Sequence, residues 1–263
     1  MNKKTIFITG AGQGIVKATA QLFAKKGWFV GLSDINQQNL DNLASELGKE
    51  NCVSYFMDVQ DIPQIKKVIA EFGQQTGGRM DVLFNNAGIL FTGGFGEKVA
   101  LEKQHSLVNI NLNGLLSVSH IALPFLKATP KSTLMSMCSA SSIMGNPDLT
   151  VYAATKSAVK SLTEGLNMLF KKDDIHVTDL CPGNVKTDML IPEQEHMGLT
   201  DKMMSLGPED VAMMAWNALS SKKVHHYKGA NIKLVLYLRW LLPYSVFQSI
   251  LTGVFFKDVI AKN

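Results

Sequence analysis

The chain has 263 residues, enough for one large domain or two small ones with a substantial hydrophobic core. Hydrophobic residues make up 46% and charged residues 18%, a balance that excludes a disordered chain. The formal net charge of +4 gives no indication of nucleic-acid binding.

Short β-branched runs alternate with amphipathic helical stretches through the first two thirds of the chain. Strands are expected at residues 5–9, 28–33, 52–57, 81–84, 133–138 and 175–180. Helices are expected at residues 15–26, 37–47, 62–75, 97–127 and 151–170. This alternation predicts a doubly wound parallel sheet of the α/β class, Rossmann-like and three-layered. We expect one domain: residues 1–229 with the catalytic site, and residues 230–263 as its C-terminal helical extension.

A glycine-rich turn follows the first expected strand and precedes the first expected helix. It reads Thr9-Gly10-Ala11-Gly12-Gln13-Gly14-Ile15. Glycines let backbone amides approach a pyrophosphate, and the helix N-terminus supplies donors and the positive end of a dipole. Such a turn is weak evidence by itself, but the strand before it and the helix after it favour a dinucleotide site.

Asp34 stands at the end of the second expected strand, 24 residues beyond Gly10. A carboxylate there can accept hydrogen bonds from the adenosine ribose and repels a 2′-phosphate. Neither Gln13 nor Ile35 offers a positive charge to offset this repulsion, so NAD is favoured over NADP. A helix N-cap or a solvated acid is the alternative reading of Asp34.

Two further strand ends carry residues suited to a cofactor. Asp58-Val59 follows the third strand, where a carboxylate can meet an adenine amino group. Asn85-Asn86-Ala87-Gly88 follows the fourth, with small residues where a cofactor would pass close to the backbone. Each alone more often marks an ordinary turn.

Tyr152 and Lys156 are four residues apart, so on a helix they share one face. An ammonium close to a phenol lowers the phenol's pKa from about 10, which makes Tyr152 a candidate general acid/base. Ser139 follows a strand and can donate a hydrogen bond to a substrate oxygen. Most Tyr/Lys pairs at this spacing are surface neighbours, so the pair alone does not establish a site.

Taken together and in this order, these motifs resemble the short-chain dehydrogenase/reductase family of the Tyr-x-x-x-Lys type. The resemblance rests on the glycine turn, Asn85 to Gly88, Ser139 and Tyr152-Ala153-Ala154-Thr155-Lys156. Pro182-Gly183-Asn184-Val185-Lys186-Thr187 matches the family's segment after the sixth strand. The resemblance covers roughly residues 4–218. It implies a nicotinamide-dependent oxidoreductase acting on CH–OH groups, in a homodimer or homotetramer.

The resemblance also implies a role for each matching residue. Tyr152 would exchange a proton with the substrate oxygen, Lys156 would hold the nicotinamide ribose, and Ser139 would polarise the carbonyl. Asn111 matches an asparagine that holds a proton-relay water, with its neighbouring asparagines as alternatives. The expected cofactor contacts are Gly10, Gln13, Gly14, Ile15, Asp34, Asp58, Val59, Asn86, Ala87, Gly88, Tyr152, Lys156, Pro182, Gly183, Val185 and Thr187.

Val16 departs from the family pattern, which usually has glycine there. That glycine lets the first helix pack close to the strand and the cofactor, so the valine is expected to weaken dinucleotide binding. This departure is what favours the alternative of a dinucleotide-binding regulator without catalytic turnover.

Residues 188–206 are rich in aliphatic side chains and methionine, in a region that the family uses as a mobile lid. Flexible methionines suit an apolar ligand, although ordinary helix packing is the alternative. The substrate is therefore expected to be a small apolar alcohol or ketone, such as a lipid-, sterol- or retinoid-like molecule. The residues concerned are Met189, Leu190, Ile191, Met197, Leu199, Met203 and Met204.

The C-terminal tail is apolar and basic. From Asn217 onward it holds seven Lys or Arg and one acid, a charge of +6, so the preceding residues carry −2. Lys233, Arg239 and Pro243 interrupt the run, which argues against a spanning helix. Its aromatic and cationic residues suit an amphipathic segment over residues 230–256 on a membrane surface. Alternatively, this segment contacts another subunit or covers the substrate entrance. If membrane contact is its main role, the alternative function of the whole protein is that of a membrane-interface interaction protein.

The three cysteines form no CxxC pair, which predicts reduced thiols and a cytoplasmic protein, with or without a peripheral membrane contact. No segment before residue 230 is expected to span a membrane. No metal site is expected either, because His225-His226 has no third ligand at a suitable spacing and is read as a solvated pair.

Overall fold

The computed structural model describes residues 3–93, 95–96, 99–191, 204–254 and 256. Within these residues a seven-stranded parallel sheet has the order β3-β2-β1-β4-β5-β6-β7. The strands are β1 (Thr5–Thr9), β2 (Phe29–Asp34), β3 (Cys52–Phe56), β4 (Val82–Asn85), β5 (Thr133–Met137), β6 (His176–Pro182) and β7 (His225–Lys228).

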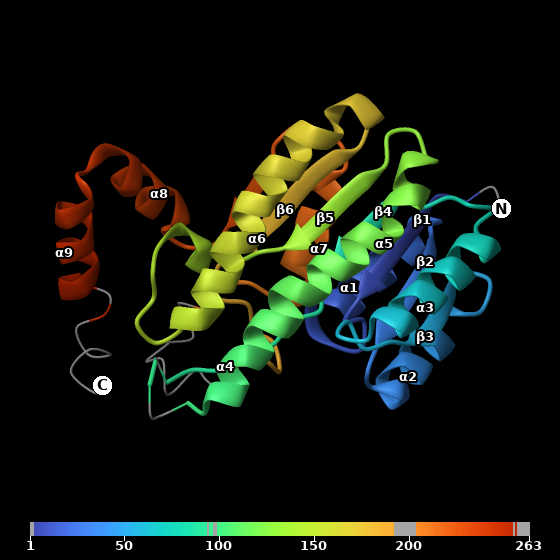
Figure 1. Cartoon of the computed structure of the whole chain (residues 1–263), viewed down its shortest axis with the longest axis horizontal. Helices are drawn as coiled ribbons and strands as arrows, with labels where there is room; N and C mark the ends of the chain where they lie inside the picture. Colours follow the sequence, from blue (N-terminus) through green and yellow to red (C-terminus); the bar gives the residue numbers. More distant parts are fainter. Residues whose placement is uncertain (1–2, 94, 97–98, 192–203, 255, 257–263) are drawn as a thin grey trace.

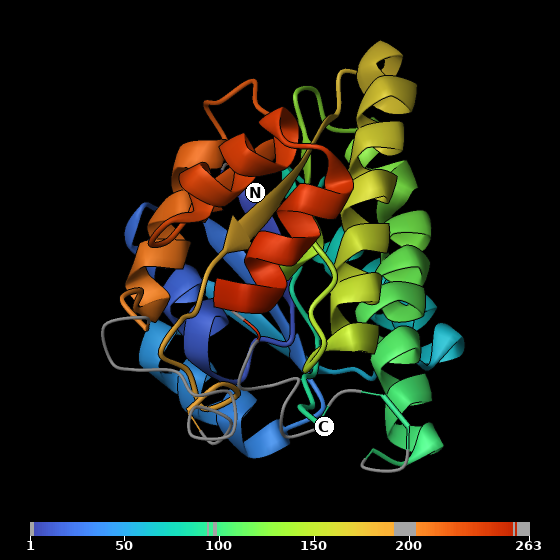
Figure 2. The ribbon, with the colours of Figure 1, turned by 90° about the vertical axis from the view of Figure 1, so that its left-hand side faces the viewer.

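Helices cover both faces of the sheet, and Figure 2 shows α7 on one side with α5 and α6 on the other. One layer contains α1 (Gly14–Lys25), α2 (Gln37–Leu47) and α7 (Pro208–Ala218). The opposite layer contains α3 (Ile62–Gln75), α4 (Leu101–Val108), α5 (Leu115–Lys127) and α6 (Thr150–Leu169). The expected three-layer, doubly wound α/β fold is confirmed.

Alternating side chains on the strands fill the two cores between these layers. On β1, Ile6 and Ile8 pack in the α1 layer, whereas Phe7 points to the α3 layer and meets the Phe72 ring edge-on at 5.1 Å. All of these side chains are fully buried. All five residues of β1 are buried, and its three central residues are hydrophobic, as expected for a parallel strand covered on both faces.

The segment expected to be one helix over residues 97–127 is divided in the structure. α4 begins at Leu101 and ends at Val108, a π-helical turn covers Asn109–Gly114, and α5 then runs to Lys127. Residues 97 and 98 lie outside the described part of the chain. The π turn inserts an extra residue into the helical repeat, which hydrophobic periodicity does not predict.

By length and composition, Leu101–Lys127 is the one helical stretch in the described part of the chain that could cross a membrane. No such segment was expected. The indication is weak, since 39% of its most apolar window is buried and a core helix passes the same test.

Two elements near the C-terminal end had no counterpart in the expected pattern. α7 follows Gly207 and has a proline in its first turn, a start signal that the sequence does contain. β7 is a four-residue strand at the end of the sheet order, and its His-His-Tyr-Lys sequence lacks a β-branched run. The expectation that His225 and His226 form a solvated pair is wrong, because both are half-buried in this strand.

Two helices extend from the β7 end of the sheet, as Figure 1 shows at its left edge. They are α8 (Ile232–Leu241) and α9 (Tyr244–Val254), here called the C-terminal arm. The arm follows β7 directly, so it starts at the same edge of the sheet where the other strands end. This edge also carries the glycine turn and the expected catalytic residues.

Candidate active site

A cavity of about 750 Å³ lies at the carboxyl edge of the sheet, around the point between β1 and β4 where the strand order reverses. Ligands of open α/β sheets bind at such a point. Every residue expected to contact the cofactor lines this cavity, and so does Ser139. Asn111 is not among its lining residues.

The glycine turn brings the start of α1 to the cavity. Gly10 has φ +70°, and a Cβ on it would stand 2.8 Å from the Cα of Ala87 at the end of β4. The first turn of α1 has no side-chain cap. Its unpaired N–H groups and the positive end of the helix dipole therefore favour an anion such as a pyrophosphate.

Asp34 fixes the shape of the glycine turn in addition to lining the cavity. Its Oδ2 accepts a hydrogen bond from the Gly12 backbone at 2.8 Å, and its Oδ1 accepts one from the Asn36 backbone at 2.8 Å. Asn36, not Asp34, caps α2, by accepting from the Asn39 backbone. Asp34 is therefore neither a helix cap nor a solvated acid.

The ends of β1 and β4 are joined through a threonine side chain. Thr9 Oγ1 accepts hydrogen bonds from the backbone N–H groups of Asn86 and Ala87, each at 3.1 Å. This contact fixes the small residues of the Asn85–Gly88 segment beside the glycine turn, where both line one wall of the cavity.

Tyr152 and Lys156 lie on α6 and face the same cavity as Ser139, which follows β5. The Lys156 ammonium donates to the Met137 carbonyl at 2.8 Å and lies 5.6 Å from the centre of the Tyr152 ring. Ser139 Oγ accepts from the Ser141 backbone at 3.2 Å, and its hydroxyl interacts with the Tyr152 phenol. The helix and the strand end thus bring all three side chains together.

The expected lowering of the Tyr152 pKa by Lys156 is wrong for the protein without cofactor. Burial raises the pKa of Tyr152 to about 12, and the hydrogen bond with Ser139 offsets this in part. Burial also lowers the pKa of Lys156. The ammonium points to the Met137 carbonyl, so desolvation of the phenol outweighs the attraction between the two side chains.

Asn111 lies in the π-helical turn and is buried. Its Nδ2 donates to the Ile89 carbonyl at 2.9 Å, and its Oδ1 accepts from the Ile89 backbone at 2.8 Å. Both polar ends therefore hold the chain just after Gly88. The role of Asn111 toward a relay water stays a prediction.

The chain just before the expected lid segment is bonded to the last residue of that segment. Val185 and Leu206 form an isolated parallel bridge, and the Lys186 backbone donates to the Leu206 carbonyl at 2.9 Å. Met189 and Leu190 line the cavity, whereas Met204 is buried. Met197, Leu199 and Met203 lie outside the described residues.

The C-terminal arm also lines the cavity. The sequence did not decide whether this segment contacts a membrane, another subunit or the substrate entrance. Ile232 and Val235 of α8 contribute side chains, and Phe256 follows after α9. Apolar residues of other segments also line the cavity, and their positions could not be deduced from periodicity. They are Leu90, Ile143, Met144 and Leu149, accompanied by the polar Ser141, Asn146 and Asp148.

Val16 is fully buried in the core of the α1 layer and is not among the residues that line the cavity. Its methyl groups face protein atoms, in the same cluster as Val185. A weakening of cofactor binding by this residue stays a prediction.

Comparison with known proteins agrees with this geometry. The family model described as short chain dehydrogenase matches residues 4–198. The chain belongs to the short-chain dehydrogenase/reductase family. It is therefore an oxidoreductase of the kind that acts on CH–OH groups, and the resemblance inferred from the motifs is confirmed.

Two curated relatives of this dehydrogenase differ in substrate. A meso-2,3-butanediol dehydrogenase of Serratia marcescens is 32% identical, over 88% of this chain and 92% of the relative. A 3-oxoacyl-[acyl-carrier-protein] reductase of Thermotoga maritima is 34% identical, over 80% of this chain and 88% of the relative.

Solved structures share the fold. A short-chain dehydrogenase/reductase from Burkholderia phymatum in complex with NAD has a TM-score of 0.81 at 24% identity, covering 90% of this chain and 93% of that one. ElxO with NADP bound has a TM-score of 0.78 at 25% identity, covering 88% and 99%. One of these solved structures thus holds NAD and the other NADP.

The raised pKa of Tyr152 predicts how the cofactor-free dehydrogenase titrates. At about pH 10 a phenol of pKa about 12 is roughly 1% ionised, whereas an ordinary tyrosine is about half ionised. Ultraviolet difference spectra between the wild type and Tyr152→Phe are expected to show no phenolate band at that pH. When both proteins are unfolded in urea at the same pH, the wild type should show about half a phenolate more per chain than Tyr152→Phe. A half-ionised Tyr152 in the folded protein would contradict the effect of burial.

Proposed function

We propose that the chain is an NAD-dependent dehydrogenase or ketone reductase that interconverts a secondary alcohol and a ketone of an apolar substrate. One observation carries the proposal: Ser139, Tyr152 and Lys156 line the same cavity as Asp34 and the uncapped start of α1. The candidate proton-transfer groups and the residues expected to bind a dinucleotide therefore line one cavity.

Each of the three polar side chains has a distinct role in this proposal. Tyr152 exchanges a proton with the substrate oxygen through its phenol, and Ser139 donates a hydrogen bond to the same oxygen. Lys156 holds the nicotinamide ribose, for which its ammonium must turn from the Met137 carbonyl. Asn111 fixes the main chain at Ile89, beside Gly88 of the cavity wall.

The cavity wall formed by the glycine turn, the start of α1 and Asp34 suits a dinucleotide. The close approach of Gly10 to Ala87 and the uncapped amides of α1 suit a pyrophosphate, and Asp34 suits the adenosine ribose. Asp58 and Val59 would contact the adenine, while Pro182 to Thr187 would contact the nicotinamide half. When bound, the nicotinamide ring donates or accepts the hydride; the protein supplies position and electrostatics.

The preference for NAD rests on Asp34. Its carboxylate is fixed by the Gly12 and Asn36 backbones, so it cannot easily turn away from a 2′-phosphate. The neighbouring Ile35 is 65% exposed and carries no charge. A fixed negative charge at this position therefore favours the free ribose hydroxyls of NAD.

The apolar substrate class is supported by the lining beyond the catalytic residues. Met189 and Leu190 of the expected lid segment, and Ile232 and Val235 of α8, line the cavity with aliphatic and thioether side chains. Burying apolar surface there stabilises a hydrophobic substrate by about 25 cal/mol for each Å² removed from water. Lipid-, sterol- or retinoid-like alcohols fit this chemistry.

We also propose that the C-terminal arm belongs to the same domain and rests on a membrane surface. Ile232 and Val235 face the cavity, while Leu234, Tyr237 and Trp240 on the same helix are 55%, 59% and 79% exposed. Exposed aromatic residues with Lys233 and Arg239 beside them suit the interface of an anionic bilayer. An apolar substrate could then enter from the lipid. A homodimer or homotetramer stays a prediction.

Activity of the wild type and of Tyr152→Phe tests the proposed function. With NAD and a panel of apolar secondary alcohols, the wild type is expected to produce the absorbance of reduced nicotinamide. Tyr152→Phe removes the proton-transfer group, so kcat should fall by about 100- to 10,000-fold with NAD affinity nearly unchanged. Tyr55→Phe is the matched control, because Tyr55 lies on β3 and its hydroxyl is buried without a hydrogen-bond partner. NAD binding without any turnover would favour a dinucleotide-binding regulator.

Asp34→Asn tests the cofactor preference. The variant keeps an acceptor oxygen for the glycine turn but removes the charge that repels a 2′-phosphate. The ratio of kcat/KM for NAD to that for NADP should fall by about 10-fold or more, since hydrogen bonds to charged groups contribute about 1.5–3 kcal/mol. Asp41→Asn, an exposed acid on α2 outside the cavity, is the control. A wild type that prefers NADP would refute this assignment.

Vesicle flotation tests the arm. Wild-type protein should float with vesicles of phosphatidylcholine and phosphatidylserine, and the double variant Tyr237→Ala/Trp240→Ala should partition at least roughly tenfold less because apolar area is lost. Phe56→Ala removes an aromatic side chain that is 49% exposed at the end of β3 and serves as control. Equal recovery of all three proteins away from the vesicles would overturn membrane attachment.

A further inference from the structure

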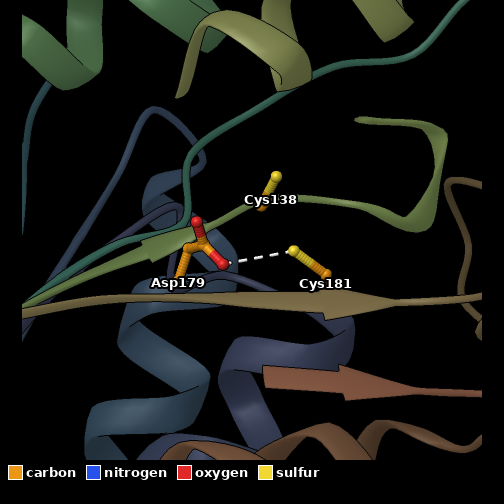
Figure 3. A group of neighbouring side chains, drawn as sticks. All are labelled: Cys138, Asp179 and Cys181. Atoms are coloured by element: carbon orange, nitrogen blue, oxygen red, sulfur yellow. Dashed lines mark hydrogen bonds between the residues drawn. The ribbon is translucent and has the colours of Figure 1, made fainter. Parts of the chain in front are cut away.

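Three side chains with metal-binding atoms meet between the sheet and α6, as Figure 3 shows. Cys138 directly follows β5, while Asp179 and Cys181 lie on β6. Met137 pairs with Leu180 in the ladder, so the next residues, Cys138 and Cys181, stand side by side and face the same way. Asp179 precedes Cys181 by two residues and shares that face.

The distances between the three groups are close to those of a tetrahedral site. Cys181 Sγ lies 3.2 Å from Asp179 Oδ1, and the three ligand atoms all lie within 4.8 Å of one another. Zn–S bonds of about 2.3 Å at tetrahedral angles place two thiolates about 3.8 Å apart. Small side-chain rotations therefore suffice to enclose an ion. The Lys156 carbonyl, 3.3 Å from Cys138 Sγ, is an available fourth donor.

Hydrogen bonding to His225 fixes the orientation of the Asp179 carboxylate. Its Oδ2 accepts a hydrogen bond from His225 Nδ1 at 2.9 Å, and His225 Nε2 lies 3.0 Å from Glu164 Oε1 on α6. Such an outer partner is typical of metal-ligating carboxylates, because it fixes the oxygen that points to the ion. An Asp–His ion pair explains the burial of Asp179 but not the two thiols beside it.

The surroundings exclude water and still leave a route of entry. Cys138, Asp179 and Cys181 are each at most 1% exposed, and the two thiols pack in an apolar cluster with Leu115 and Val159. Cys138 also lines the cavity, so an ion can reach the thiols from there before a cofactor binds. A dry site with two sulfur donors and one carboxylate favours zinc over magnesium or calcium.

We propose that Cys138, Asp179 and Cys181 bind one thiophilic divalent cation of the Zn²⁺ type, next to the catalytic residues. Both thiols lose their protons to solvent as the ion binds, and sulfur and carboxylate electron pairs form the new bonds without any redox change. The sequence predicted no metal site because Cys138 and Cys181 are 43 residues apart; the β5–β6 pairing makes them neighbours.

Zinc binding to the full-length protein tests the proposal directly. After reduction and treatment with a chelator, the protein is dialysed against ZnCl₂ and its zinc content measured. The wild type is expected to retain about one zinc per chain, and Cys138→Ala and Cys181→Ala to lose it. Cys52→Ala is the matched control, because Cys52 is another buried free thiol, on β3, and should retain the zinc.

Cobalt provides a second, spectroscopic measurement. Co²⁺ added to the wild type and to Cys52→Ala should give a thiolate charge-transfer band that Cys138→Ser and Cys181→Ser lack. The serine variants keep the polar volume, and circular dichroism verifies that each variant is folded. The proposal is overturned if reduced wild type binds no zinc, if the variants of Cys138 and Cys181 retain it, or if these cysteines are found joined as a disulfide. None of these results depends on catalytic turnover.

Discussion

The parallel pairing of β1 with β4, of β4 with β5 and of β5 with β6 determines where the candidate active site of this protein lies. Parallel strands end at one edge of a sheet, so the residues that follow them come together regardless of their distance in sequence. The glycine turn after β1, the Asn85–Gly88 segment after β4 and Ser139 after β5 meet in this way. The cavity is the space that these strand ends leave between them.

Burial determines the protonation state of Tyr152 and Lys156, the proposed catalytic pair. Lys156 is 4% exposed, and its ammonium is satisfied by the Met137 carbonyl at the end of β5. Because the phenol of Tyr152 is desolvated and this charge points elsewhere, the cofactor-free protein holds Tyr152 in the protonated form. In the proposed function, a cofactor that draws Lys156 away from Met137 would bring its charge closer to the phenol and lower the pKa of Tyr152.

Local sequence signals predicted most of the elements and most of the candidate site residues, but they could not predict contacts between residues on different strands of the sheet. The turn from Gly10 to Gly14 and the Tyr152–Lys156 spacing are short-range patterns, and the structure places both at the cavity. The hydrogen bond from Gly12 to Asp34 and the adjacency of Cys138 and Cys181 depend on strand order and register, which no local pattern contains. Desolvation of Tyr152 likewise depends on the assembled fold.

Deuterium transfer to the cofactor tests the central claim, that the cavity holds NAD and an apolar alcohol for direct hydride transfer. The protein is incubated with NAD and an apolar secondary alcohol deuterated at its carbinol carbon, and the reduced cofactor is analysed by mass spectrometry. The account predicts one deuterium in the reduced nicotinamide for each ketone formed. Ketone formed with deuterium released to water, or bound NAD that gains no deuterium from any alcohol tested, would contradict it.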